Sequence, residues 1–211
     1  ADVLGGDDAA AVHQARNKGG WYVDSALGND SEAGRIGATW AALEVLGALG
    51  RLDDLPAADR ATTVDWLRSL ATKPRALDQS GALARSLQLL KEPVSGALTR
   101  VAAPRTDDFA GLTPDDRAVR LADTYGYVLV QEAERRHPAV PRGTWEAVLR
   151  DGAETLPYEQ LYQLVHVLKA AGSPQSVFAP VLKRLDRERL DDGTVRDPDA
   201  YIGNPDASLF V

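Results

Sequence analysis

The sequence predicts an all-α fold, and three of its features support that class. Apolar residues recur at three- and four-residue steps, as at Ile36, Trp40 and Leu43, which is the spacing of one helix face. Segments in which apolar and polar residues alternate, as they do in half-buried strands, are almost absent. Residue types that start and stop helices flank most of the periodic segments.

The clearest predicted helix covers residues 31–49. Ser31 is suited to cap its N-terminus, and Gly50 is suited to end it. After an acidic turn at residues 53–56, the apolar spacing predicts a second helix over residues 57–70. We expect these two helices to form a helical hairpin.

Five more helices are predicted by the same spacing, and one of them has a clear start. Thr113 is suited to cap it, and Pro114 in its first turn is followed by two acids near the positive end of the helix dipole. The stretch 92–111 contains prolines, glycines and an acidic pair, so we expect an irregular crossover between two helical layers. We expect residues 1–211 to form a single helical-repeat domain. The five helices are expected over residues 79–91, 114–136, 144–151, 158–171 and 174–189.

Composition excludes several classes of function. The 24 Lys and Arg residues against 31 Asp and Glu give a formal charge of −7, which argues against a nucleic-acid or anionic-membrane surface. Because the chain has no Cys, disulfides, thiolate zinc sites and Cys nucleophiles are excluded. No apolar run approaches the roughly 18–20 residues that a membrane-spanning helix needs. We expect a soluble protein, with the cytoplasm slightly favoured over secretion.

An internal repeat links the two ends of the chain. Residues 19–21 (Gly-Gly-Trp) are followed by a polar loop and then by Glu-Ala at 32–33. Residues 193–195 (Gly-Thr-Val) are followed by a similar loop and then by Asp-Ala at 206–207, and each pair of matching positions is 174 residues apart. The second copy of the repeat is therefore expected over residues 180–211.

Residues 15–70 resemble one repeat of the terpenoid cyclase and protein prenyltransferase superfamily, the squalene-cyclase repeat. In that family a QxxDGxW-type turn leads through a loop to a helix that ends in Leu-Gly, and then to a second helix with a Leu-rich end. Here the turn has Ala15 where the family has Gln. The second turn, residues 189–195, keeps Asp192 and Gly193 but lacks both Gln and Trp.

The resemblance implies an α/α toroid, in which helical hairpins form a curved double layer around a central cavity. In the turn, glycine permits a tight reversal, and the flat ring of Trp21 is expected to pack between neighbouring helices. Residues 204–211 look like the first turn of another inner helix, by their match to residues 29–37. With fewer helices than a closed toroid of the family, the array is expected to be incomplete. Further chain or a partner subunit would then complete it.

The chain lacks a complete catalytic motif of this superfamily. Class II cyclases carry a DxDDT-type motif whose middle acid, kept protonated by desolvation, protonates an alkene or epoxide. The nearest match, residues 197–201, puts Asp199 at the position of that acid but lacks the Asp and Thr that follow it. Asp206 is a second candidate acid. Either acid is also consistent with a solvated polar loop.

No cofactor is required by the sequence. The acidic pairs at 53–54 and 107–108 lack the DDxxD spacing that holds Mg²⁺ in class I enzymes, and turn or cap roles explain them better. The acidic loop 24–32 has oxygen ligands suited to Ca²⁺ but lacks the spacing of an EF-hand. The zinc site of protein prenyltransferases cannot form without Cys. Mg²⁺ and Ca²⁺ are therefore weak alternatives to a protein without a cofactor.

Aromatic residues on the predicted helices are candidates for the lining of a ligand cavity. Such rings bind prenyl chains and stabilise cations, although aromatic residues at helical spacing also serve as ordinary core. A histidine among them is consistent with a satisfied interior side chain as well as a ligand contact. The candidates are Trp40, Tyr125, Tyr127, Tyr162 and His166.

Three functions remain open from the sequence. The first is a protein that binds an apolar, isoprenoid-like small molecule or a peptide in a concave helical cavity, without a complete catalytic motif. The second is an acid-initiated terpenoid-cyclase-type enzyme that is truncated or completed by a partner. The third is a structural repeat domain of a larger protein.

Overall fold

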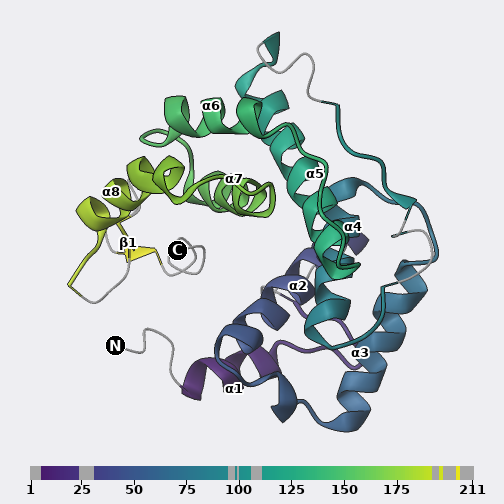
Figure 1. The fold of residues 1–211 in the computed structure, drawn as a ribbon. Coiled ribbons are helices and arrows are strands. Elements are labelled where there is room, and N and C mark those ends of the chain that lie inside the picture. The colour runs from purple at the N-terminus through teal and green to yellow at the C-terminus, as the bar shows by residue number, and fades with distance from the viewer. Residues whose placement is uncertain are drawn as a thin grey trace. The chain divides into compact units, whose positions relative to one another are not determined.

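The computed structural model describes residues 6–23, 31–94, 98, 100–105, 111–191, 195–196 and 203–204. It confirms the all-α class, since the described residues form eight α-helices and only two strands, each two residues long (Figure 1). The helices are α1 (Gly6–Gln14), α2 (Glu32–Ala48), α3 (Ala57–Leu70), α4 (Leu77–Leu89), α5 (Pro114–Ala133), α6 (Arg142–Gly152), α7 (Tyr158–Ala170) and α8 (Ala179–Glu188). Two 3₁₀ turns are η1 (Leu52–Asp54) and η4 (Gln175–Phe178), and the strands β1 (Val195–Arg196) and β2 (Gly203–Asn204) pair antiparallel.

The chain divides into two compact units. The N-terminal unit consists of residues 4–102 and 129–136, and the C-terminal unit consists of residues 1–3, 103–128 and 137–211. The boundary falls within α5, so one continuous helix belongs to both units. The toroidal arrangement of hairpins stays a prediction.

Helix α4 is the centre of the N-terminal unit. A short connection joins α2 and α3, but both helices pack mainly against α4 rather than against each other, so the expected hairpin is only partly formed. Small residues on α4, among them Ala82 and Ala84, are buried and allow its neighbours to approach closely. The core of this unit includes the buried side chains of Ile36, Leu43, Leu46, Val64, Leu67, Leu83, Leu87 and Leu90.

The turn before α2 has the conformation and packing that its sequence predicts. Gly20 adopts φ +99°, which favours glycine, and Arg16 and Tyr22 form an antiparallel bridge across the turn. The ring of Trp21 lies 5.9 Å from that of Trp66 on α3, and the Arg35 guanidinium of α2 lies 4.8 Å above the Trp21 ring. Trp21 therefore packs against two helices, as expected.

The C-terminal unit is built on the packed helical pair α6 and α7, with η4 and α8 following in sequence. Its buried side chains come from the apolar faces of α5, α6, α7 and η4. They include Leu121, Val128, Trp145, Leu149, Leu161, Leu164, Val167, Leu168 and Phe178. No helix among the described residues is long and apolar enough to cross a membrane.

Most predicted helix bounds are close to the observed ones, and the differences have local causes. The predicted helix 57–70 has the bounds of α3, and Ser31 caps α2 by accepting a hydrogen bond from the Gly34 N–H at 3.0 Å. Helix α5 ends before residue 136 because Arg135 takes φ 57°. The segment 174–189 is not one α-helix, because η4 precedes α8. Pro180 lies in the first turn of α8 and has no N–H, so it cannot donate the hydrogen bond that would continue an α-helix from the residues before it.

Two further expectations concern irregular or terminal segments. The described residues of the stretch 92–111 contain no α-helix or named strand, as expected of a crossover. Of the helix start expected over 204–211, only Asn204 lies among the described residues, and it belongs to β2. Helix α1 was not predicted, because its short segment of small and acidic residues has little apolar periodicity.

Candidate functional site

Three of the five predicted ligand-binding residues lie together in the C-terminal unit. Tyr125 of α5 and Tyr162 of α7 have ring centroids 6.0 Å apart in an edge-on arrangement. His166, one turn after Tyr162, lies 5.2 Å from Tyr125 and 6.2 Å from Tyr162. Edge-to-face contacts at these distances stabilise the arrangement of the rings. The three residues form an aromatic cluster between α5 and α7.

The other two predicted ligand-binding residues do not join this cluster. Tyr127 is buried, and because it is two residues after Tyr125 it lies on the opposite side of α5. Trp40 belongs to the N-terminal unit, where its Nε1 donates to Glu44 at 3.2 Å. The candidate acids Asp199 and Asp206 lie outside the described residues, so an acid role for either stays a prediction.

A cavity of about 220 Å³ lies between α7, η4 and α8, next to the aromatic cluster. We call it the α7–α8 cavity. Most of its lining is apolar, and each of the two helices supplies side chains three or four residues apart along one face. The apolar lining consists of Leu161, Val165, Phe178, Val181, Leu182 and Leu185. The polar lining consists of Tyr158, Tyr162, Lys169 and Gln175, so Tyr162 belongs to both the cavity and the aromatic cluster.

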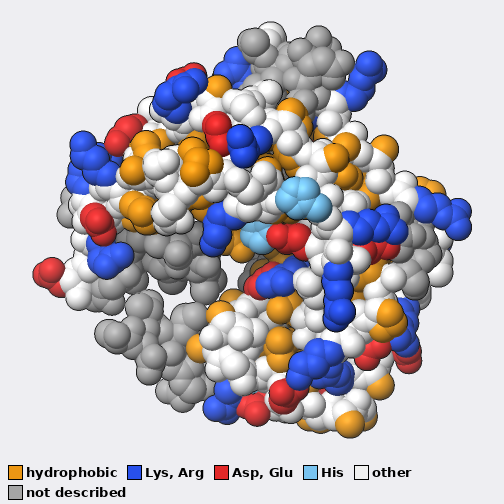
Figure 2. Space-filling view, viewed as in Figure 1, with side chains coloured by type: hydrophobic (Ala, Val, Ile, Leu, Met, Phe, Trp, Pro, Cys, Tyr) orange, Lys and Arg blue, Asp and Glu red, His pale blue; other side chains and the backbone are white. Residues whose placement is uncertain are grey.

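Burial differs along the cavity. Leu161, Phe178 and Val181 are buried, whereas Lys169 and Gln175 are exposed. Leu182 is 50% exposed, which is unusual for a large apolar side chain in this structure. Figure 2 shows hydrophobic side chains at the surface over α6–α8, with charged side chains around them. The cavity is therefore apolar inside and polar at its rim.

A buried arginine fixes the wall of the cavity that α8 provides. The Arg184 guanidinium donates to the carbonyl oxygens of Ala153 at 3.1 Å and Leu156 at 2.7 Å, in the connection between α6 and α7. It also donates to the Glu188 carboxylate at 3.1 Å and lies 4.6 Å above the Tyr158 ring. These contacts join α8 to the start of α7, so the cavity has a preformed wall.

The titration of two groups reflects the same network. Burial, together with the hydrogen bond that its hydroxyl donates to Glu188, raises the pKa of Tyr158 to about 12. Burial alone would raise the pKa of Glu188, but hydrogen bonds from Tyr158 and two arginines hold it below its usual value. Because the Tyr158 hydroxyl already has Glu188 as its partner, it is not a free donor for a ligand.

A second hollow in the same unit, which we call the α5–α6 groove, has a volume of about 780 Å³. It lies between the first half of α5, α6 and the start of α7. Its apolar lining includes the buried Leu121 and Trp145. Its charged lining consists of Asp115, Arg117 and Asp151. The groove thus differs from the α7–α8 cavity in carrying carboxylates.

The part of the chain that the structure describes offers no strong metal site. The described residues contain no group of three or more side chains that could hold a metal ion. Asp53 and Asp54 are ion-paired, with Lys91 and Arg51 respectively. Glu32 pairs with Arg75 at 2.6 Å, and that hydrogen bond lowers the pKa of the Glu32 carboxyl. Residues 24–30 and 107–108 lie outside the described residues.

Comparison with known proteins finds no relative of this chain. No protein-family model, no curated protein and no solved structure matches the chain. The resemblance to the terpenoid cyclase and prenyltransferase superfamily therefore stays a prediction.

Sequence reasoning missed Lys169, Gln175 and the residues that α8 contributes. The contribution of α7 could have been predicted from the sequence, because one face of a helix carries residues 158, 161, 162, 165 and 169. The contribution of α8 depends on how it packs against α7, and sequence periodicity does not report that packing.

Proposed function

We propose that the protein binds a small apolar molecule in the α7–α8 cavity. The observation that carries the proposal is an apolar cavity, closed on one side by aromatic Tyr162 and on another by a helix that buried Arg184 holds in place. Ligand sites are mostly apolar, preformed and have few polar groups. The volume of about 220 Å³ is below the roughly 300–1,000 Å³ of sites for drug-sized ligands, which favours a small ligand.

Binding is a better account of this cavity than catalysis. Its described lining has no carboxylate or histidine to act as a general acid or base. His166 contacts Tyr162 behind the lining and does not itself line the cavity. The apolar side chains suit an isoprenoid-like or alkyl chain, whose affinity rises by about fourfold for each additional buried methylene group.

The test is direct binding with a blocked variant and a matched control. N-phenyl-1-naphthylamine, a neutral apolar probe that fluoresces in apolar surroundings, is titrated into the protein and displaced with geraniol or 1-decanol. Val165→Trp fills the cavity and is expected to reduce probe binding by at least tenfold. Val119→Trp changes a residue of α5 that is 64% exposed and outside the cavity lining, so it should bind as the unchanged protein does.

Circular dichroism checks that both variants fold. Failure of the unchanged protein to bind the probe would contradict the proposal. Equal binding by the Val165→Trp variant would place the ligand elsewhere.

An acid-initiated cyclase activity is the alternative that the family resemblance supports. We would incubate the protein with linear isoprenoid diphosphates and analyse the products, with Asp199→Asn as the comparison. Turnover that is lost in this variant would replace binding with catalysis as the function. Binding without any new product leaves the binding function in place.

A further inference from the structure

We infer that the ligand of the α7–α8 cavity carries an anionic head group, a carboxylate or a phosphate, which pairs with Lys169. This inference rests on the proposed binding function. It concerns the chemical class of the ligand, an amphiphile with an apolar tail and a negative head.

The charge of the cavity supports this class of ligand. Lys169 is the one charged residue among the described residues that line it, and no carboxylate lines it there. A ligand with a positive head group would meet only repulsion from this lining, and a neutral ligand would gain nothing from it. Lys binds carboxylates and phosphates as a compact point charge with three donors.

Lys169 is also not used for an ion pair within the described part of the chain. On a helix, an acid three or four residues from a lysine can form an ion pair with it. The corresponding positions hold Val165, His166, Gly172 and Ser173, none of which is acidic. The position of Lys169 in the last turn of α7 suits a cation beside the negative end of the helix dipole. That placement accounts for the charge but leaves the ammonium group available to a ligand.

The gradient of burial orients the ligand. Leu161, Phe178 and Val181 are buried and suit the tail, whereas Lys169 and the Gln175 amide are exposed at the rim and suit the head. Tyr158 donates to Glu188, so the polar groups left for the head are those at the rim. An amphiphile therefore enters with its tail toward Phe178 and Val181 and keeps its head in contact with solvent.

Two features make the preference for an anion specific to this cavity. The whole chain has a formal charge of −7, which disfavours anionic ligands in general. The α5–α6 groove carries Asp115 and Asp151, and its carboxylates would repel the same head group. A measured preference for anions thus has a local origin near Lys169.

The test compares ligands that share one tail and differ in charge. Decanoate, decyl phosphate, 1-decanol and decyltrimethylammonium are each used to displace N-phenyl-1-naphthylamine at low salt. We expect the two anions to bind about two- to fivefold more tightly than 1-decanol, the modest gain of an exposed charge pair. Decyltrimethylammonium should bind more weakly than 1-decanol. The tighter of the two anions identifies the head group as carboxylate or phosphate.

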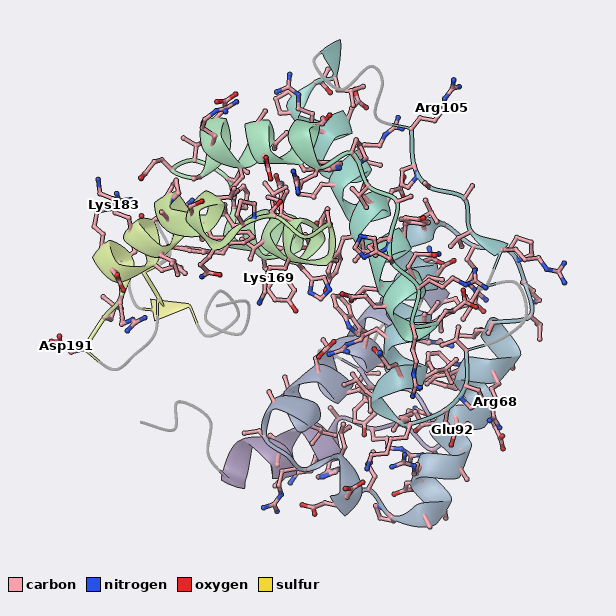
Figure 3. The ribbon with its side chains drawn as sticks, in the orientation of Figure 1. Arg68, Glu92, Arg105, Lys169, Lys183 and Asp191 are labelled. Carbon is pink, nitrogen blue, oxygen red and sulfur yellow. The ribbon has the colours of Figure 1, made fainter. Side chains whose placement is uncertain are left out.

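Variants assign the preference to one residue. Lys169→Gln should remove the preference for anions over 1-decanol, measured as the ratio of their affinities in the same variant, and Lys169→Glu should reverse the preference toward decyltrimethylammonium. Lys183→Gln is the matched control: Lys183 is exposed on α8, outside the cavity lining, and Figure 3 shows the two lysines on their separate helices. This control should keep the full preference for anions.

The outcomes separate the inference from the function on which it rests. Equal binding of decanoate and 1-decanol by the unchanged protein overturns the inference but leaves the apolar binding function standing. An effect of Lys183→Gln equal to that of Lys169→Gln also overturns it, because general surface charge would then be responsible. If no compound with this tail displaces the probe and the probe itself does not bind, both the function and the inference fail.

Discussion

Arg16 in the N-terminal unit and Arg184 in the C-terminal unit are both nearly buried, and these two arginines have different partners. In the N-terminal unit, Arg16 donates to the Asp59 carboxylate at 2.8 Å and to the Asp59 carbonyl oxygen at 2.7 Å. In the C-terminal unit, Arg184 donates to two backbone carbonyls and to Glu188. The Asp59 side chain is 45% exposed, whereas that of Glu188 is 18% exposed. The carboxylate partner of Arg16 is thus more accessible to water than that of Arg184.

This difference shows that the value of a buried charge depends on what its removal leaves behind. A carboxylate that is half exposed can replace a lost partner with water. The two backbone carbonyl oxygens that Arg184 reaches lose this donor away from bulk solvent, and the resulting desolvation dominates the cost, although Glu188 keeps Tyr158 and Arg187 as donors. The preformed wall of the α7–α8 cavity is therefore expected to be the more vulnerable of the two regions.

The largest effect is expected from removing the two arginines in turn. Arg184→Met leaves the Ala153 and Leu156 carbonyls without this donor and removes one of the three donors to the Glu188 carboxylate, so the free energy of unfolding should fall by about 3–4 kcal/mol. Arg16→Met should cost about half as much, because Asp59 is hydrated. Urea unfolding followed by circular dichroism measures both. A smaller loss for Arg184→Met than for Arg16→Met would contradict the comparison.

The next largest difference in stability loss is expected between alanine substitutions at two glycines, one in each unit. Gly20 and Gly172 have φ +99° and +76°, which are unfavourable for alanine. A Cβ on Gly20 would lie 2.6 Å from the Thr62 carbonyl oxygen, whereas one on Gly172 would meet open space. Gly20→Ala should therefore cost roughly 2–3 kcal/mol, and Gly172→Ala roughly 1 kcal/mol.

Thermal unfolding of both variants checks this expectation. Gly37→Ala on α2 is the control, because its Cβ also meets open space while its helical conformation suits alanine. The control should leave stability unchanged or raise it slightly. Equal losses at positions 20 and 172 would show that the backbone conformation alone, rather than the close approach to Thr62, limits position 20.

The sequence was most informative where structure depends on local rules. Ser31 and the apolar spacing of residues 57–70 predicted the start of α2 and both ends of α3, because caps and helix faces are set within a few residues. Tyr162 and His166 were found as a pair because four residues make one helix turn. Lys169 and Arg184 were missed, because their roles depend on the packing of α8 against the α6–α7 pair. Pro180 was a local signal, and it accounts for the break between η4 and α8.

Two buried tyrosines extend the comparison to alkaline pH. Burial is the main cause that raises the pKa of both Tyr22 and Tyr158 from 10 to about 12. Between these values the unfolded chain has lost the phenolic proton and the folded chain has kept it. The stabilisation is therefore complete below pH 10 and is lost as the pH rises toward 12.

By pH 11 each tyrosine should have lowered the free energy of unfolding by about 1.4 kcal/mol. Urea unfolding at pH 8, 10 and 11 measures this slope in the unchanged protein and in Tyr22→Phe and Tyr158→Phe. Each substitution removes one phenol, so each should reduce the alkaline loss by a similar amount. A slope that neither substitution changes would assign the alkaline sensitivity to other groups.

At neutral pH the same two substitutions should have opposite effects, and these are the smallest that we expect. The Tyr22 hydroxyl is buried without a hydrogen-bond partner among the residues that the structure describes, so Tyr22→Phe should raise the free energy of unfolding by roughly 1 kcal/mol. The Tyr158 hydroxyl donates to Glu188, so Tyr158→Phe should lower it by roughly 1 kcal/mol. Urea unfolding at pH 7 distinguishes the signs. A loss of stability in Tyr22→Phe would mean that its hydroxyl has a bridging water or another partner, and the N-terminal unit would then resemble the C-terminal unit in depending on a buried polar contact.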